Sequence, residues 1–196
     1  MIDDLLEDQS ARIWKQLGLT IPCDVSAVCN YYNINLIRRP LGDEVSAFYL
    51  TLPSGRTEIV VNSLDSPRRR QFSIAHELGH HVINSARPSM RLLMREAEVD
   101  EDEEERYASK FAACLLMPEP LVVKMYDSLE DDPDWRLSVL SDRFYVSRPA
   151  MLIRLKQLDL PVVNQWYVTE ITLQSVAESA ANTNRLRPPF LPRKHS

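Results

Sequence analysis

The chain lacks the long apolar runs and the basic leader that would direct it into or across a membrane. No stretch of its 196 residues approaches the roughly 18 consecutive apolar positions that a membrane-spanning helix needs. Its first eight residues, M-I-D-D-L-L-E-D, are acidic, whereas a secretory signal peptide begins with basic residues. These absences argue against a membrane or secreted protein and predict a cytoplasmic one.

Cysteine and basic charge are also scarce. Cys23, Cys29 and Cys114 form neither an even set nor a C-x-x-C pair, which predicts buried or free thiols rather than a disulfide framework. The formal net charge of −5 disfavours a chain that coats nucleic acid. The composition, 44% hydrophobic and 26% charged with no internal repeats, is typical of a soluble globular protein with one substantial core.

One segment, residues 74–83, carries definite chemistry. It holds an H-E-x-x-H motif in which His76 and His80 flank Glu77. The spacing of four places both histidines on one helix face, where they can close on a single Zn²⁺ at about 2.0–2.1 Å each. Glu77 starts too close to bind that ion comfortably but can reach a water held by it, which is the general-base position of a zinc peptidase.

A chance match has to be weighed against metal binding, because only three positions of the motif are fixed. The flanking residues are apolar, so a helix without a metal would bury three polar groups with nothing to satisfy them. Metal binding is therefore the better interpretation. His81 lies on a different face and is expected to meet solvent or to support a ligand from behind. Gly79, which costs about 1 kcal/mol in a helix interior, predicts a neighbour packed closely against that turn.

Hydrophobic periodicity predicts an α+β fold with a short three-stranded antiparallel sheet. Helices, a meander of strands and the motif helix are expected in that order, at residues 4–18, 22–32, 33–37, 45–52, 57–62 and from 67 onward. After a loop over 85–102, helices are expected at 103–117, 121–129, 137–145 and 149–158, the last two forming a helix–turn–helix-like pair. The tail beyond 160 shows only a strand pattern at 166–173 and a disordered end. The resulting division is a domain at 1–130, a helix–turn–helix-like segment at 131–160 and an extension at 161–196.

A catalytic zinc site needs a third protein ligand, and the acidic run at 96–105 offers several. On a helix over 103–117, Ala108 and Phe111 mark the buried stripe. Glu105 and Glu104 both border that stripe, with Glu105 somewhat favoured. Periodicity alone leaves both as candidates.

Several spaced motifs resemble the ImmA/IrrE metallopeptidase family. Residues 72–81 read F-S-I-A-H-E-L-G-H-H, similar to the family's F-(T/S)-x-A-H-E-x-x-H helix. Residues 105–118 read E-R-Y-A-S-K-F-A-A-C-L-L-M-P, similar to its E-x-x-A-N-x-F-A-x-x-L-L-M-P helix, and residues 146–160 resemble its V-S-x-x-A-x-x-x-R-L-x-x-L-G-L segment. Ser109 departs from the usual Asn and Tyr107 from a frequent acid; Ser109 can still hydrogen-bond behind a ligand.

The resemblance implies a zincin-like fold and a cytoplasmic, gluzincin-like zinc metalloprotease. His76, His80 and Glu105 correspond to the metal ligands and Glu77 to the catalytic base. Zn²⁺ is the implied metal, and the same donors accept Mn²⁺. Family members are hydrolases that cleave helix–turn–helix repressors, and the cleavage derepresses stress-response or mobile-element genes. The implied role is therefore transcription regulation through proteolysis of a repressor.

Two other functions compete with the peptidase. A metal-stabilised module could remove a repressor by protein–protein contact alone, although such a binder has no need of Glu77. Direct DNA binding through residues 137–158 is the third interpretation, resting on the basic residues Arg148, Arg154 and Lys156. Short helix pairs more often serve core packing, and the acidic balance of the chain counts against DNA binding as its main role.

Overall fold

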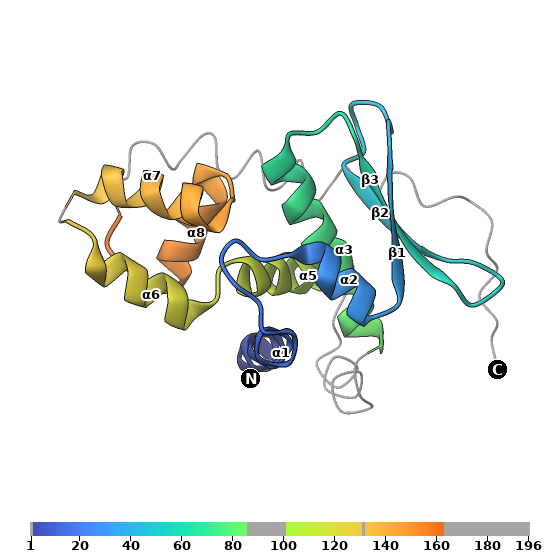
Figure 1. Ribbon diagram of the computed structural model, residues 1–196, viewed down its shortest axis with the longest axis horizontal. Helices are drawn as coiled ribbons and strands as arrows, with labels where there is room; N and C mark the ends of the chain where they lie inside the picture. The colour runs from blue at the N-terminus through green and yellow to red at the C-terminus, as the bar shows by residue number, and fades with distance from the viewer. Residues whose placement is uncertain (1, 86–100, 131, 163–196) are drawn as a thin grey trace.

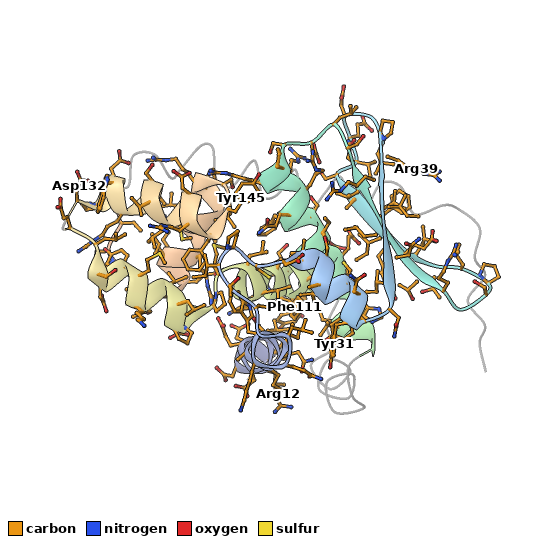
Figure 2. The ribbon with its side chains drawn as sticks, viewed as in Figure 1. Arg12, Tyr31, Arg39, Phe111, Asp132 and Tyr145 are labelled. Carbon is orange, nitrogen blue, oxygen red and sulfur yellow. The ribbon has the colours of Figure 1, made fainter. Side chains whose placement is uncertain are left out.

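The computed structural model describes residues 2–85, 101–130 and 132–162, in which helices enclose a small sheet (Figure 1). The elements are, in order, α1 (Ile2–Leu17), α2 (Val25–Tyr31), β1 (Ile34–Arg39), β2 (Ala47–Thr51), β3 (Thr57–Asn62), α3 (Pro67–Ser85), α5 (Glu101–Leu116), α6 (Glu119–Ser128), α7 (Pro133–Phe144) and α8 (Arg148–Gln157). The α+β class is thereby confirmed. The sheet lies towards one end and α6 to α8 at the other, so that Arg39 and Asp132 are far apart, with α3 and α5 between them (Figure 2).

The sheet is mixed, with the strand order β1-β3-β2, so the predicted antiparallel meander is wrong. At the central strand, Ile59 is paired in parallel with Leu36 of β1 and antiparallel with Tyr49 of β2. The central strand β3 is the most completely buried of the three. β1 ends in exposed Arg38 and Arg39, charges that an edge strand tolerates.

Helix α3 has an N-terminal cap, since the Ser66 hydroxyl accepts a hydrogen bond from the Arg69 backbone N–H at 3.3 Å. Cations in the first turn of a helix oppose its dipole. Here Arg68 forms an ion pair with Asp142 of α7 at 2.6 Å, and Arg69 lies 3.4 Å from Asp65. These carboxylates offset the unfavourable charges, and the first of them also ties α3 to the helical end of the molecule.

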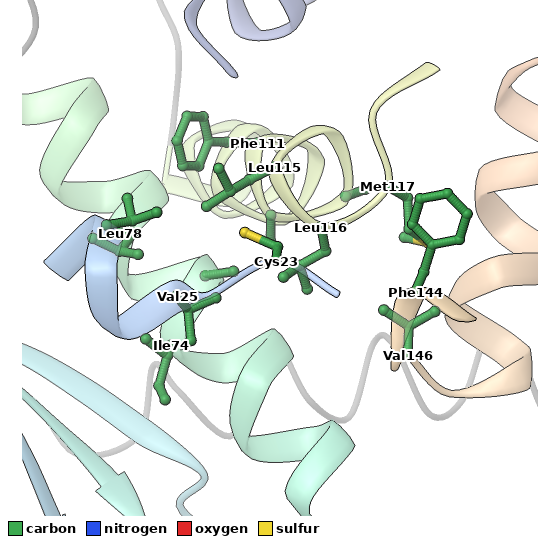
Figure 3. Packing of buried hydrophobic residues seen from close by; sticks show 14 of the residues in the cluster. Cys23, Val25, Ile74, Leu78, Phe111, Leu115, Leu116, Met117, Phe144 and Val146 are labelled. Carbon is green, nitrogen blue, oxygen red and sulfur yellow. The ribbon is translucent and has the colours of Figure 1, made fainter. Parts of the chain in front are cut away.

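The predicted close neighbour of Gly79 is helix α5. A Cβ at position 79 would lie 2.8 Å from the backbone oxygen of Ala108 and 2.9 Å from its Cα. No side chain fits at that separation, so glycine is what lets α3 and α5 cross so closely. Around the crossing, Leu78 of α3 and Phe111 and Leu115 of α5 are completely buried (Figure 3).

All three cysteines are buried, free thiols, as the sequence predicts. Cys23 belongs to the same hydrophobic cluster as the side chains around the α3–α5 crossing (Figure 3). Burial raises the pKa of Cys23, Cys29 and Cys114 to about 12 each, so the thiols stay protonated near neutral pH.

The C-terminal end of α5 is held by two distant side chains. The indole N–H of Trp14 in α1 donates to the Leu115 carbonyl at 2.8 Å, and Nε of Arg154 in α8 donates to the Met117 carbonyl at 2.9 Å. The last carbonyls of a helix have no partner within the helix, so these donors cap α5 from two sides. Arg154, only 1% exposed, also forms an ion pair with Glu7 of α1 at 2.6 Å.

The helical pair α7–α8 is present as predicted, with a turn in which Tyr145 adopts a left-handed conformation at φ 57°. Two of the three basic residues suggested for DNA contact already have partners within the protein, because Arg154 is buried and Arg148 forms a surface ion pair with Asp134 at 2.6 Å. These contacts count against a DNA-reading surface on α8.

Other expectations fall on parts of the chain that the structure leaves undescribed. Of the loop expected at 85–102, residues 86–100 lie outside the described residues, while α3 and α5 include its two ends; the strand at 166–173 and the tail after 181 also lie outside them. The boundaries at 130 and 160 stay predictions. No helix within the described ranges has both the length and the hydropathy to cross a bilayer.

Candidate metal centre

Two crossing helices bring His76, His80 and Glu105 together. The Nε2 atoms of the two histidines are 3.1 Å apart. Oε2 of Glu105 lies 3.1 Å from Nε2 of His76, and its Oε1 lies 3.3 Å from Nε2 of His80. Donors about 2.0–2.1 Å from a tetrahedral ion stand about 3.3 Å from one another, so this spacing suits Zn²⁺. Among the described residues, these three form the group able to hold a metal ion.

The helix crossing explains why residues 29 positions apart converge. His76 and His80 lie on the face of α3 turned to α5, as their four-residue spacing predicts. Gly79 on that same helix lets the α5 backbone approach, which brings Glu105 within reach of both rings. The three candidate donors are thus positioned by backbone packing.

The protonation states of His80 and Glu105 depend on each other. Burial alone would lower the pKa of His80, but hydrogen bonds to Glu104 and Glu105 raise it to about 10. Burial alone would raise the pKa of Glu105, but hydrogen bonds from His76 and His80 lower it to about 2. Without a metal, therefore, a proton on His80 compensates the carboxylate of Glu105 near neutral pH. A divalent ion can replace that proton, since its ligands bind in their deprotonated forms.

Glu77 lies beside this cluster and is 3% exposed. Burial raises its pKa above the ordinary value, while the neighbouring histidines and a hydrogen bond from the Tyr49 backbone partly oppose that rise. Tyr49 belongs to β2, so the edge strand of the sheet helps to fix the carboxylate of the motif. A carboxylate with a raised pKa is suited both to accept and to return a proton near neutral pH.

Each histidine has a polar partner behind it. Nδ1 of His76 lies 3.1 Å from the Ser109 hydroxyl, the hydrogen bond expected from the sequence. Nδ1 of His80 lies 3.4 Å from Oε1 of Glu104. Helical periodicity presents Glu104 only as an alternative to Glu105 for the third ligand. Helical periodicity cannot tell one side of an imidazole ring from the other, so the position of Glu104 behind His80 was missed.

His81 is separate from the donor cluster, as its place on another helix face predicts. Its Nδ1 lies 3.2 Å from the Tyr49 hydroxyl, and its ring packs edge-on against Tyr32 at a centroid distance of 5.3 Å. Burial lowers the pKa of His81. This histidine joins α3 to α2 and β2.

The fold and the donor cluster together describe an α+β domain with an H-E-x-x-H helix crossed by a helix that supplies a glutamate. Residues 29–156 match the model of one peptidase family, Peptidase_M78, described as the IrrE N-terminal-like domain. The chain belongs to this family, and the resemblance predicted from its sequence is confirmed.

Known proteins similar to this chain are longer. The radiation response metalloprotease IrrE of Deinococcus radiodurans is 31% identical over 109 residues, which make up 54% of this chain and 33% of that protein. A transcriptional regulator of Mycobacterium tuberculosis has a similar structure, with a TM-score of 0.59 and 16% identity, over 80% of this chain and 47% of that chain. The structural likeness shows a shared fold. The chain thus spans less than half the length of either relative.

Proposed function

We propose that the protein is a metal-dependent endopeptidase, with His76, His80 and Glu105 as the ligands of Zn²⁺ and Glu77 as the general base. The observation that carries the proposal is that the two Nε2 atoms and the Glu105 carboxylate lie within 3.1–3.3 Å of one another, beside a buried glutamate. Family membership supports it. Mn²⁺ suits the same imidazole and carboxylate donors.

When bound, such an ion supplies Lewis acidity, polarising a peptide carbonyl and making water a stronger acid. The chain's own contribution is the placement of its side chains. Glu77 takes the proton of the attacking water and delivers it to the amine that leaves as the peptide bond breaks. Its burial favours the first transfer, because a carboxylate in an apolar setting binds a proton more readily.

The proposed substrate is a helix–turn–helix transcriptional repressor, cut at one peptide bond so that stress-response or mobile-element genes are derepressed. The names of two similar proteins are compatible with this role: one relative is a radiation response metalloprotease and one structural neighbour is a transcriptional regulator. A cytoplasmic location follows from such a substrate.

The test is a cleavage assay with Glu77→Gln as the matched control. Gln keeps the shape of the side chain but cannot accept a proton, so the variant should retain the fold and bind Zn²⁺ while cleavage falls by at least about 100-fold. The Zn²⁺-loaded proteins are incubated with the repressor encoded beside the gene, and the products are identified by mass spectrometry. Equal cleavage by both proteins would show that Glu77 is not the base.

A non-proteolytic anti-repressor is the alternative. It predicts that the wild type and Glu77→Gln bind the repressor equally and leave it uncut. Glu77 argues for the enzyme, because burying a carboxylate is costly and a module that acts by contact alone has no need of one at this position. Gel-shift titration of the same mixtures with operator DNA separates the two functions. An anti-repressor that acts by contact alone would release the repressor from the DNA without producing repressor fragments.

A further inference from the structure

We propose that Ser109 and Glu104 are positioning residues that hold the two histidines in unlike ways, His76 through a neutral hydroxyl and His80 through a carboxylate. The inference rests on the proposed metal centre and goes beyond its ligand set. It also assigns Glu104 a role behind the site instead of a place among the ligands.

The geometry of the rings carries the argument. On both histidines the Nε2 atom faces the donor cluster, within 3.1–3.3 Å of Glu105. The opposite nitrogen, Nδ1, faces Ser109 on His76 and Glu104 on His80. Because Nε2 must present its lone pair to a metal, Nδ1 has to carry the proton and donate it to these two partners.

The two partners come from the same helix as Glu105. One face of α5 therefore supplies a donor to the centre and a hydrogen-bond acceptor to each ring. Glu104 and Glu105 are adjacent in sequence yet lie on opposite sides of the His80 ring, at Nδ1 and Nε2 respectively. The crossing of α3 and α5 thus fixes the orientation of the histidines as well as the position of the third donor.

The partners differ in charge and in exposure. Hydrogen bonds to an ionised acceptor are roughly twice as strong as those between neutral groups. Glu104, however, is 32% exposed and 3.4 Å from its ring, while Ser109 is 3.1 Å from its own. Each partner therefore contributes to metal affinity, and neither substitutes for the other because each contacts a different ring.

The test measures Zn²⁺ affinity by chelator competition in the whole 196-residue chain at fixed pH. Loss of such supporting groups typically weakens metal binding about 10–100-fold, and this range is expected for Ser109→Ala and for Glu104→Ala. Ser109→Asn should restore most of the affinity, because an amide oxygen can accept the same proton. Glu103→Ala is the matched control: it removes a charge one residue away, where the side chain pairs with Arg106, and should leave affinity unchanged.

A second readout follows the ring protons directly. In the Zn²⁺-loaded protein, nitrogen-15 NMR should show both histidines protonated at Nδ1. Ser109→Ala should speed solvent exchange of the His76 ring proton alone, and Glu104→Ala that of His80 alone. A merely structural role would change melting temperature without this residue-specific pattern.

The outcomes separate this inference from the proposed function. Wild-type protein that binds no Zn²⁺ would overturn both. Tight binding by the wild type with unchanged affinity in folded Ser109→Ala and Glu104→Ala would overturn only the positioning roles. Loss of affinity in Glu103→Ala to the same degree would also overturn them, because the effect would then reflect the charge of α5 in general.

Discussion

His80 and Glu105 face each other in the metal-free protein as a charged pair held by hydrogen bonds. The pKa of His80 is raised to about 10 and that of Glu105 is lowered to about 2. A raised histidine pKa stabilises the fold fully below its ordinary value of 6.5, and this stabilisation is lost as pH rises towards 10. A lowered carboxylate pKa stabilises the fold above 4.5, and this is lost as pH falls towards 2.

This pair should therefore stabilise the metal-free protein most between pH 4.5 and 6.5, the window in which both contributions are complete. The measurement is the melting temperature of chelator-treated protein across pH 3–10. Excess Zn²⁺ should abolish the loss on the alkaline side, because the ion takes the place of the proton on His80. A metal-free protein that becomes steadily more stable up to pH 9 would contradict this charge state.

At the scale of elements, the contact between α3 and α5 sets the geometry of the site. Gly79→Ala would place a Cβ 2.8–2.9 Å from backbone atoms of Ala108. Backbone cannot rotate out of the way, so the helices must separate, at a cost of about 1–3 kcal/mol for overpacking, reduced by about 1 kcal/mol of gained helix propensity. The variant should show both a lower melting temperature and weaker Zn²⁺ binding.

The control for that substitution is Gly55→Ala, in the turn between β2 and β3. Its φ of 81° strains any L side chain, yet no heavy atom lies within 4 Å of the added Cβ. It should lower stability without changing the Zn²⁺ affinity of the folded protein. Equal loss of affinity in the two variants would mean that the helix separation does not govern the site.

Short-range sequence patterns predicted most of these helices and strands. They did not predict which strands pair with each other in the sheet. The spacing of His76 and His80 already placed them on one helix face, and the glycine between them indicated a close contact. The sheet order could not be deduced the same way, because alternation in β1 and β3 does not say which strand lies beside which. The position of Glu104 behind His80 could not be predicted for a similar reason, since it depends on the offset of α5 along the axis of α3.

At the scale of the whole molecule, side chains of α1 and α8 contact each other and the C-terminal end of α5. Arg154→Ala would remove the donor to the Met117 carbonyl and leave Glu7 without its buried cation. Breaking a buried ion pair from one side costs about 3–5 kcal/mol, and the lower part of that range applies because Glu7 is partly exposed. Chemical denaturation should show a loss of this size. Arg148→Ala, whose pair with Asp134 lies at the surface, should cost at most about 1 kcal/mol.

The hydrogen bond from the Trp14 indole to the Leu115 carbonyl limits how far this domain can be shortened at its N-terminal end. The family match begins at residue 29, and all proposed ligands follow it, so a version trimmed to the match would keep the whole motif. It would nevertheless lose Trp14 and Glu7, leaving a carbonyl of α5 bare and Arg154 buried without its carboxylate. The smallest piece that folds around the donor cluster is therefore expected to be longer than the stretch that matches the family model, and to include α1.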